Sequence, residues 1–193
     1  MIRINNIKVP LDFDFTNIIK LASEKTGIPE NKIKSAEISK KSVDARKKND
    51  INFIVSLNIS AELKYEKRVK NAVYVENFVY RIPKVTVEKR PVIVGFGPAG
   101  MFAALVLAIA GAKPIVLERG MDVDNRIRAV EKFRNSGVLD PECNVQFGEG
   151  GAGTFSDGKL TTGIKDKRIG WILRKLVEFG APSDIIYLSK PHI

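Results

Sequence analysis

The sequence predicts an α/β protein in two parts, a small α/β domain over residues 1–88 and the beginning of an open βαβ domain over residues 89–193. Three observations predict this. Apolar and polar residues alternate in the first part, as they do in half-buried strands. Beyond it, two short apolar runs at 92–94 and 114–117 flank a stretch rich in Ala and Leu. The order strand, helix, strand is typical of a parallel βαβ unit.

The elements expected in the first part alternate between strands and helices. Ile18, Ile19 and Ala22 would share one face of a helix, and Gly27 would end it. A polar segment at 45–50 separates two strand-like runs, as a hairpin loop does. In chain order we expect a strand over 2–9, a helix over 15–25, strands over 33–44 and 51–61, a helix over 63–71 and a β-rich segment over 73–87. This order favours a compact ferredoxin-like α/β domain.

In the second part the apolar pattern becomes continuous. The run 92–94 suits a strand that is covered on both faces. The stretch 101–110 suits a buried helix that Gly111 ends, and a second strand is expected over 113–118. Further helices are expected after two acidic caps: one begins at Asp122 or Asp124 and ends at Gly137, and one begins at Asp166 and ends before the segment 180–182.

The amino-acid composition argues against several classes of protein. The chain of 193 residues is 44% apolar, which is enough to form packed cores. Its longest apolar stretch, 101–110, is shorter than the ~20 residues that a membrane span needs, so we expect a cytoplasmic protein without a membrane partner. The single cysteine, Cys143, excludes an internal disulfide and is expected to be a packed side chain. The single histidine, His192, argues against a catalytic triad or a metal site.

The charge of +10 is concentrated in the first part of the chain. Residues 1–90 contain 19 Lys and Arg against 11 Asp and Glu, a net charge of +8, and residues 91–193 carry only +2. Such a basic face can attract nucleic acid or anionic substrates. Since no recognition motif accompanies the charge, we favour a solvated surface and consider nucleic acid an unlikely partner. A basic nucleic-acid-binding or protein-binding module in residues 1–88 stays open as an alternative.

The most informative motif lies between the two apolar runs. Residues 95–100 read Gly-Phe-Gly-Pro-Ala-Gly, the pattern G-x-G-x-x-G, at the end of an expected strand. Gly95 permits the tight turn, Gly97 lets a pyrophosphate approach the backbone, and Gly100 lets the helix pack on the strand. The helix N-terminus then faces the phosphates. Glu118 ends the second strand, where a carboxylate can accept hydrogen bonds from ribose hydroxyls. The spacing therefore predicts a dinucleotide site.

A second glycine-rich run helps to choose the dinucleotide. Residues 144–160 contain five glycines between positions 148 and 158, together with Phe147, Phe155 and Asp157. A flexible linker would lack these aromatic and charged residues. Such a loop can bring backbone N–H groups close to a flat ligand or its phosphates. A connecting loop without a ligand, and an NAD-binding dehydrogenase domain, are the alternatives.

These motifs carry a resemblance to a known family. The fingerprint 95–100, the segment Val116-Leu117-Glu118-Arg119-Gly120 and the run 144–160 resemble the N-terminal part of the bacterial NAD(P)/FAD-dependent oxidoreductases, FAD-dependent dehydrogenases of the glutathione-reductase-like flavoprotein superfamily. The segment 42–48 is similar to a motif of the small domain that precedes the FAD domain in that group. The resemblance implies FAD as the cofactor, with these binding residues: Gly95, Gly97, Pro98, Ala99, Gly100, Glu118, Arg119, Arg126, Gly150, Gly151, Gly153 and Ser156.

The resemblance also sets expectations for the whole protein. It implies an incomplete Rossmann-like FAD-binding domain and a flavin-dependent oxidoreductase of unknown small-molecule substrate, with NAD(P)H as a possible electron donor. Members of the group are longer than this chain, so we expect a fragment or a natural short form that is inactive alone. Catalytic residues are not assigned. For Arg119 and Arg126, a plain surface charge is the alternative to a role near the adenosine or the phosphates.

Overall fold

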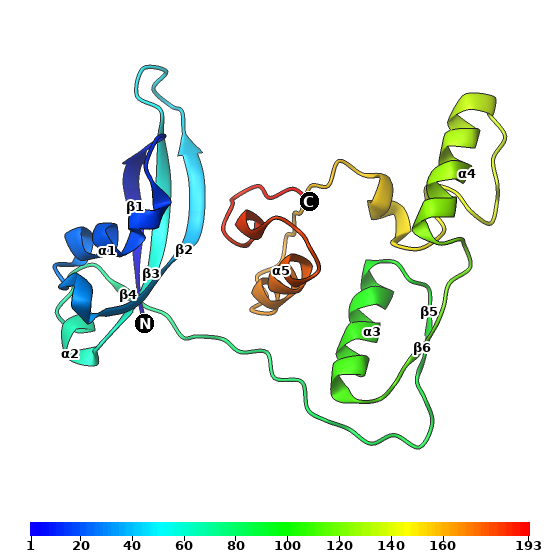
Figure 1. Ribbon diagram of the computed structural model, residues 1–193, viewed down its shortest axis with the longest axis horizontal. Helices are drawn as coiled ribbons and strands as arrows, with labels where there is room; N and C mark the ends of the chain where they lie inside the picture. The colour runs from blue at the N-terminus through cyan, green and yellow to red at the C-terminus, as the bar shows by residue number, and fades with distance from the viewer. The chain divides into compact units, whose positions relative to one another are not determined.

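A four-stranded antiparallel sheet and a two-stranded parallel sheet form the framework of the chain (Figure 1). The computed structural model describes residues 1–193 and confirms a mixed α/β protein. The residues group into two units. Unit 1 comprises Met1–Val79 and Leu160–Ile193, and unit 2 comprises Tyr80–Lys159. None of the helices has both the length and the apolar character that crossing a lipid bilayer requires.

Unit 1 begins with alternating strands and helices. The strand predicted over 33–44 is confirmed with those bounds, and the strands predicted over 2–9 and 51–61 each differ by one residue. The helix predicted over 15–25 is a 3-10 turn over 15–17 followed by an α-helix over 18–26. Gly27 ends the first helix in the left-handed conformation (φ 70°), as expected from a residue without a Cβ. The elements are β1 (Ile2–Pro10), η1 (Phe15–Asn17), α1 (Ile18–Thr26), η2 (Glu30–Lys32), β2 (Ile33–Asp44), β3 (Asn52–Ala61), α2 (Leu63–Glu66) and β4 (Val73–Tyr74).

The sheet of unit 1 has the order β2-β3-β1-β4, and every neighbouring pair is antiparallel. Its register pairs Ile2 with Ile59 and Val9 with Phe53, and a bulge interrupts β1 between Ile4 and Ile7. The side chains of the sheet that pack against α1 form the core, because alternate residues of a strand point to the same face. The buried core residues are Ile2, Ile7, Val9, Leu21, Ala22, Ile28, Val55, Leu57, Ile59 and Ala61.

Two predictions for unit 1 are wrong. The helix expected over 63–71 is a single turn, α2, and the β-rich segment expected over 73–87 contains only the two-residue strand β4. The alternating pattern of Val and Tyr in that segment meets a partner strand only at its start, where Val73 and Tyr74 pair with β1. Strand propensity without a partner to pair with does not make a strand.

The C-terminal segment of unit 1 contains α5 (Ile169–Glu178) and η4 (Ser183–Ile186). Asp166 lies just before α5, where it accepts a hydrogen bond from the backbone N–H of Arg168, but the N-cap residue itself is Arg168. After η4, the chain forms a parallel bridge between Leu188 and Lys41 of β2. The N–H of Lys41 donates to the carbonyl of Tyr187 at 2.7 Å.

Unit 2 begins its regular structure with β5 (Val92–Val94), α3 (Pro98–Ala110) and β6 (Ile115–Leu117) (Figure 1). The two strands pair in parallel, with Ile93 opposite Val116, so the predicted βαβ order is confirmed. Gly111 ends α3 in the left-handed conformation. The unit continues with α4 (Val123–Ser136), which Asp122 caps and Gly137 ends as predicted, and with η3 (Gly151–Phe155).

The parallel pair is covered on one face only. Ile93 and Val116 are half-buried, whereas Val92 is 56% exposed and Val94 is 85% exposed. The expectation that this strand is covered on both faces is therefore wrong, since α3 packs against the pair while Val92 and Val94 stay exposed. The prediction of a buried helix over 101–110 is also wrong. The helix α3 is partly exposed, and Ala110 is its one buried residue.

Candidate functional site

The fingerprint turn joins β5 to α3 at the carboxyl end of the parallel pair. Gly95 adopts a positive φ of 97°, which side-chain-bearing residues rarely adopt, and its N–H donates to the carbonyl of Leu117 at 2.7 Å. A Cβ at Gly100 would collide with the carbonyl oxygen of Gly95. Pro98 occupies the first turn of α3, where a missing N–H costs little. The first turn of a helix leaves N–H groups without intrahelical acceptors.

Glu118 lies directly after β6 and contacts this turn. Its Oε2 accepts a hydrogen bond from the N–H of Phe96 at 2.6 Å, and its Oε1 accepts one from the N–H of Gly120 at 2.9 Å. These bonds, that of Gly120 first, hold the pKa of the Glu118 carboxyl below its usual value, so the group is ionised at neutral pH. An ionised carboxylate has about four acceptor positions. The backbone N–H groups of Arg119 and Gly148 also lower the pKa of this carboxyl, so backbone donors surround it.

The glycine-rich loop lies against the same turn, although it is about fifty residues away in sequence. The N–H of Gly150 donates to the carbonyl of Phe96 at 2.9 Å. Gly151 faces Gly97 so closely that a Cβ on Gly151 would lie 3.1 Å from the Cα of Gly97. The structure therefore brings the fingerprint, Glu118 and the glycine-rich loop together at one edge of unit 2.

Arg126 binds the glycine-rich loop of this arrangement. Its side chain is fully buried on α4 and donates five hydrogen bonds, so the alternative of a plain surface charge is wrong for this residue. The acceptors are the carbonyls of Asn144, Val145, Gly148 and Glu149 and the hydroxyl of Thr154. The guanidinium also lies 4.9 Å from the centre of the Phe155 ring. Thr154 and Phe155 were not predicted as functional residues.

Two other expected site residues have local partners. Arg119 is exposed, pairs with Glu142 and lies over the ring of Phe147 at 4.9 Å. This pair lowers the pKa of the Glu142 carboxyl. Ser156 donates its hydroxyl to the carbonyl of Gly153 at 2.8 Å and so closes the end of η3. Both lie in unit 2, as do the other predicted residues of the site.

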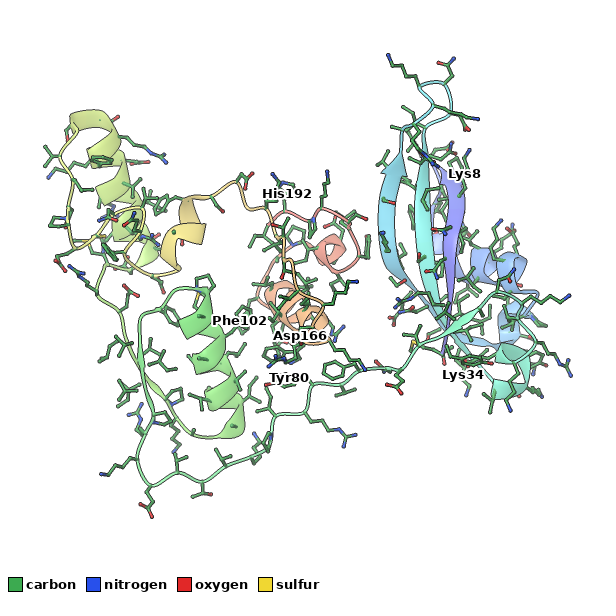
Figure 2. The ribbon with its side chains drawn as sticks, turned by 180° about the vertical axis from the view of Figure 1, so that it is seen from behind. Lys8, Lys34, Tyr80, Phe102, Asp166 and His192 are labelled. Atoms are coloured by element: carbon green, nitrogen blue, oxygen red, sulfur yellow. The ribbon has the colours of Figure 1, made fainter.

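The lone cysteine and the lone histidine lie in different units. Cys143 is buried in unit 2 and packs as a small side chain. His192 lies in the C-terminal segment of unit 1 (Figure 2), where its Nδ1 is 3.2 Å from the carbonyl oxygen of Lys190. No group of three or more His, Cys, Asp or Glu side chains within residues 1–193 is arranged to hold a metal ion.

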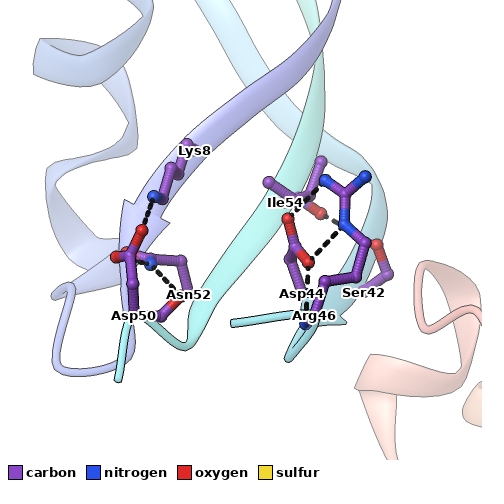
Figure 3. Close-up of polar contacts among 7 residues, drawn as sticks. All are labelled: Lys8, Ser42, Asp44, Arg46, Asp50, Asn52 and Ile54. Carbon is purple, nitrogen blue, oxygen red and sulfur yellow. Dashed lines mark hydrogen bonds and ion pairs between the residues drawn. The ribbon is translucent and has the colours of Figure 1, made fainter. Parts of the chain in front are cut away.

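A second polar cluster surrounds the β2–β3 hairpin of unit 1 (Figure 3). The guanidinium of Arg46 donates to both oxygens of Asp44 at 2.8 and 2.7 Å, and this contact lowers the pKa of the Asp44 carboxyl to about 2. Lys8 pairs with Asp50 at 2.7 Å. Figure 2 shows that Lys8 and Lys34 lie toward opposite ends of the sheet. Lys8 and Arg46 are each paired with a carboxylate, Asp50 and Asp44, so this part of the surface carries both positive and negative charges.

The chain is similar to a family model and to a protein of known sequence. A family model described as a domain of unknown function (DUF8436) matches residues 1–60. A protein of Clostridium beijerinckii, described as an uncharacterized protein, is 48% identical over 201 aligned positions that cover the whole chain. The chain spans 37% of the length of that relative. Both units therefore have counterparts in a longer protein.

Proposed function

We propose that this chain is the FAD-binding portion of a flavin-dependent oxidoreductase. The observation that carries the proposal is the position of the ionised Glu118 beside the fingerprint turn, bonded to the N–H of Phe96. The helix N-terminus of α3 supplies N–H groups for a diphosphate, and Glu118 supplies acceptors for ribose hydroxyls about one strand away. The residues present thus fit the ADP half of a dinucleotide.

The steric environment of Gly97 supports the same proposal. Its φ of −77° suits any residue, and a Cβ there would meet only the Cα of Gly151 at an ordinary 3.7 Å. Neither backbone strain nor packing therefore explains why this position is a glycine. Close approach of a phosphate to the backbone does explain it. The isoalloxazine of a bound FAD would supply the redox chemistry, while the protein binds and orients it.

The proposal also assigns a fold to each unit. The order β1-α1-β2-β3-α2-β4 and the antiparallel sheet of unit 1 support a ferredoxin-like domain. The parallel β5 and β6 with α3 support the beginning of a Rossmann-like domain. A nicotinamide dinucleotide has the same ADP half, so an NAD-binding domain is the second candidate. Glu118 would repel the 2′-phosphate of NADP.

A titration of the 193-residue chain tests the proposal. FAD, ADP, NAD and riboflavin are added separately and binding is followed by calorimetry. We expect FAD and ADP to compete for one site and riboflavin, which lacks the diphosphate, to compete poorly. Tighter binding of NAD than of FAD would favour the second candidate. Absence of binding by both ADP and FAD at millimolar concentration would overturn both candidates.

A further inference from the structure

The buried Arg126 has a bonding pattern that dinucleotide binding alone does not explain. All five of its acceptors are neutral, four backbone carbonyls and one hydroxyl, and its side chain is fully buried. Burying a charge is costly unless it is well compensated by hydrogen bonds. All of the acceptors lie in the segment 144–154. All five bonds of the guanidinium therefore go to the glycine-rich loop.

The bonds of Arg126 fix the direction of two peptide groups in this loop. In a planar trans peptide, the carbonyl and the next N–H point in opposite directions, and the chain has no cis peptide bonds. Arg126 donates to the carbonyl of Gly148 at 3.4 Å, and the N–H of Gly151 donates to the same carbonyl at 3.0 Å. The N–H of Glu149 on the far side of that peptide donates to Met121 at 3.1 Å. Arg126 also donates to the carbonyl of Glu149 at 2.6 Å. The N–H of Gly150, on the far side of that peptide, donates to the carbonyl of Phe96 at 2.9 Å.

The two outward N–H groups end on the two sides of the proposed ADP site. Phe96 belongs to the fingerprint turn. Met121 lies three residues after Glu118, which directly follows β6. Gly148 completes the arrangement, since a Cβ there would lie 2.6 Å from the Cδ of Arg126 and its φ is 124°. At this position the glycine makes room for the arginine. The resemblance assigned Gly150, Gly151 and Gly153 of this loop to the ligand, and it did not include Gly148.

We propose that Arg126 is a positioning residue that orients the peptides 148–149 and 149–150, and thereby holds the glycine-rich loop against the fingerprint turn in the geometry that receives a diphosphate. The ligand part of this inference rests on the proposed function. A lysine cannot replace the arginine, because an ammonium is a point charge whose three donors do not reproduce the planar five-donor fork. The flexible stem of lysine would serve at most some of the five acceptors.

Amide hydrogen exchange, measured by NMR on the whole chain without ligand, tests the orienting role. In Arg126→Lys we expect exchange at the amides of Glu149 and Gly150 to rise at least tenfold, while the amide of Leu57 in β3 keeps its protection. Arg128→Lys is the matched control, because Arg128 lies on the same helix and is exposed. Unchanged exchange at Glu149 and Gly150 in a folded Arg126→Lys would overturn the inference.

A milder variant keeps the test decisive if Arg126→Lys disrupts unit 2. Thr154→Val preserves the shape of the side chain but removes its hydroxyl, which accepts from Arg126 at 3.2 Å and donates to the carbonyl of Glu149 at 3.3 Å. We expect a smaller rise in exchange at the same two amides, and no rise would count against the inference.

The ligand part is measured separately. Titration with ADP should show a roughly tenfold loss of affinity in Arg126→Lys and none in Arg128→Lys. If the unsubstituted chain binds neither ADP nor FAD, the proposed function fails, whereas the exchange measurement still decides whether Arg126 orients the loop. If the chain binds ADP and Arg126→Lys binds it equally well, the ligand part of the inference is wrong.

Discussion

The carboxylate of Glu118 accepts a hydrogen bond from the backbone N–H of Phe96, 22 residues earlier in the chain, at 2.6 Å. This bond joins the end of β6 to the turn that follows β5. The second carboxylate oxygen binds the N–H of Gly120. One side chain therefore fixes the two backbone segments between which the proposed ribose and diphosphate would lie.

Replacing Glu118 by Gln should destabilise unit 2. The amide of glutamine offers one acceptor oxygen, so one of the two N–H groups would face an NH2 group instead of an acceptor. We expect a loss of about 1–3 kcal/mol in the free energy of unfolding, as for a hydrogen bond to a charged group. Chemical denaturation measures it. Glu142→Gln is the control, since its exposed pair with Arg119 should contribute less than about 1 kcal/mol. Equal effects of the two variants would contradict this reading.

The acid sensitivity of unit 2 should depend on the same residue. Because the folded pKa of Glu118 is lowered, its stabilising contribution is present above its ordinary value of 4.5 and is lost as the pH falls through the lower folded value. The glutamine in Glu118→Gln cannot titrate. The stability of this variant should therefore fall less than that of the unsubstituted chain as the pH is lowered from about 5. Unfolding curves at several pH values check this. A parallel loss in both proteins would show that other groups control the acid response.

The glycines of the fingerprint should differ sharply in their tolerance of a methyl group. Gly100→Ala should destabilise unit 2 strongly, because its Cβ would collide with the carbonyl of Gly95. Gly97→Ala should change stability by less than about 1 kcal/mol, since its φ is ordinary and its Cβ would make a normal contact. Thermal unfolding of both variants measures the difference. A destabilised Gly97→Ala would show that packing accounts for this glycine.

The hairpin of unit 1 should contain an unusually acidic carboxyl. Asp44 should titrate at about 2, because the guanidinium of Arg46 and its backbone N–H both bind the carboxylate. Any stabilisation from this contact is present above the ordinary pKa of 3.8 and is lost as the pH falls toward 2. In Arg46→Ala the pKa should rise toward its ordinary value. Carbon-13 NMR of the carboxyl group gives both values. A midpoint near 3.8 in the unsubstituted chain would refute the contact.

The core of unit 1 should respond to truncation as a packed interior does. Leu57 is fully buried between β1 and β2, so Leu57→Ala should cost about 2–5 kcal/mol. Val43 lies on the neighbouring strand and is 59% exposed, so Val43→Ala should cost less than about 1 kcal/mol. Denaturant unfolding followed by amide signals of β3 measures both changes.

Much of the fold was predictable because it is encoded locally. The strand-like run 33–44 gave the bounds of β2, and Gly27, Gly111 and Gly137 end their helices in the left-handed conformation. The segment 73–87 was not predictable, because its valines have the propensity for a strand but only its first two residues have a partner. Partners depend on topology, which single-segment patterns do not contain.

The candidate site was only partly predictable. The spacing of Gly95, Gly97, Gly100 and Glu118 located the turn and the acid, and the structure places them together. The burial of Arg126 could not be read from the sequence, because arginine is mostly exposed and its acceptors are backbone carbonyls, which every residue has. The one available signal was the density of glycines at 148–153, which leaves space for a large side chain.

An NMR titration of the chain with ADP tests the central claim most directly, because it locates the ligand as well as detecting it. The account predicts that the amide signals of Ala99, Gly100 and Gly120 shift with a common saturation curve, and that the same ADP concentrations leave the amides of β3 unchanged. Saturable binding with shifts confined to unit 1, or no shift of the fingerprint amides at all, would contradict it.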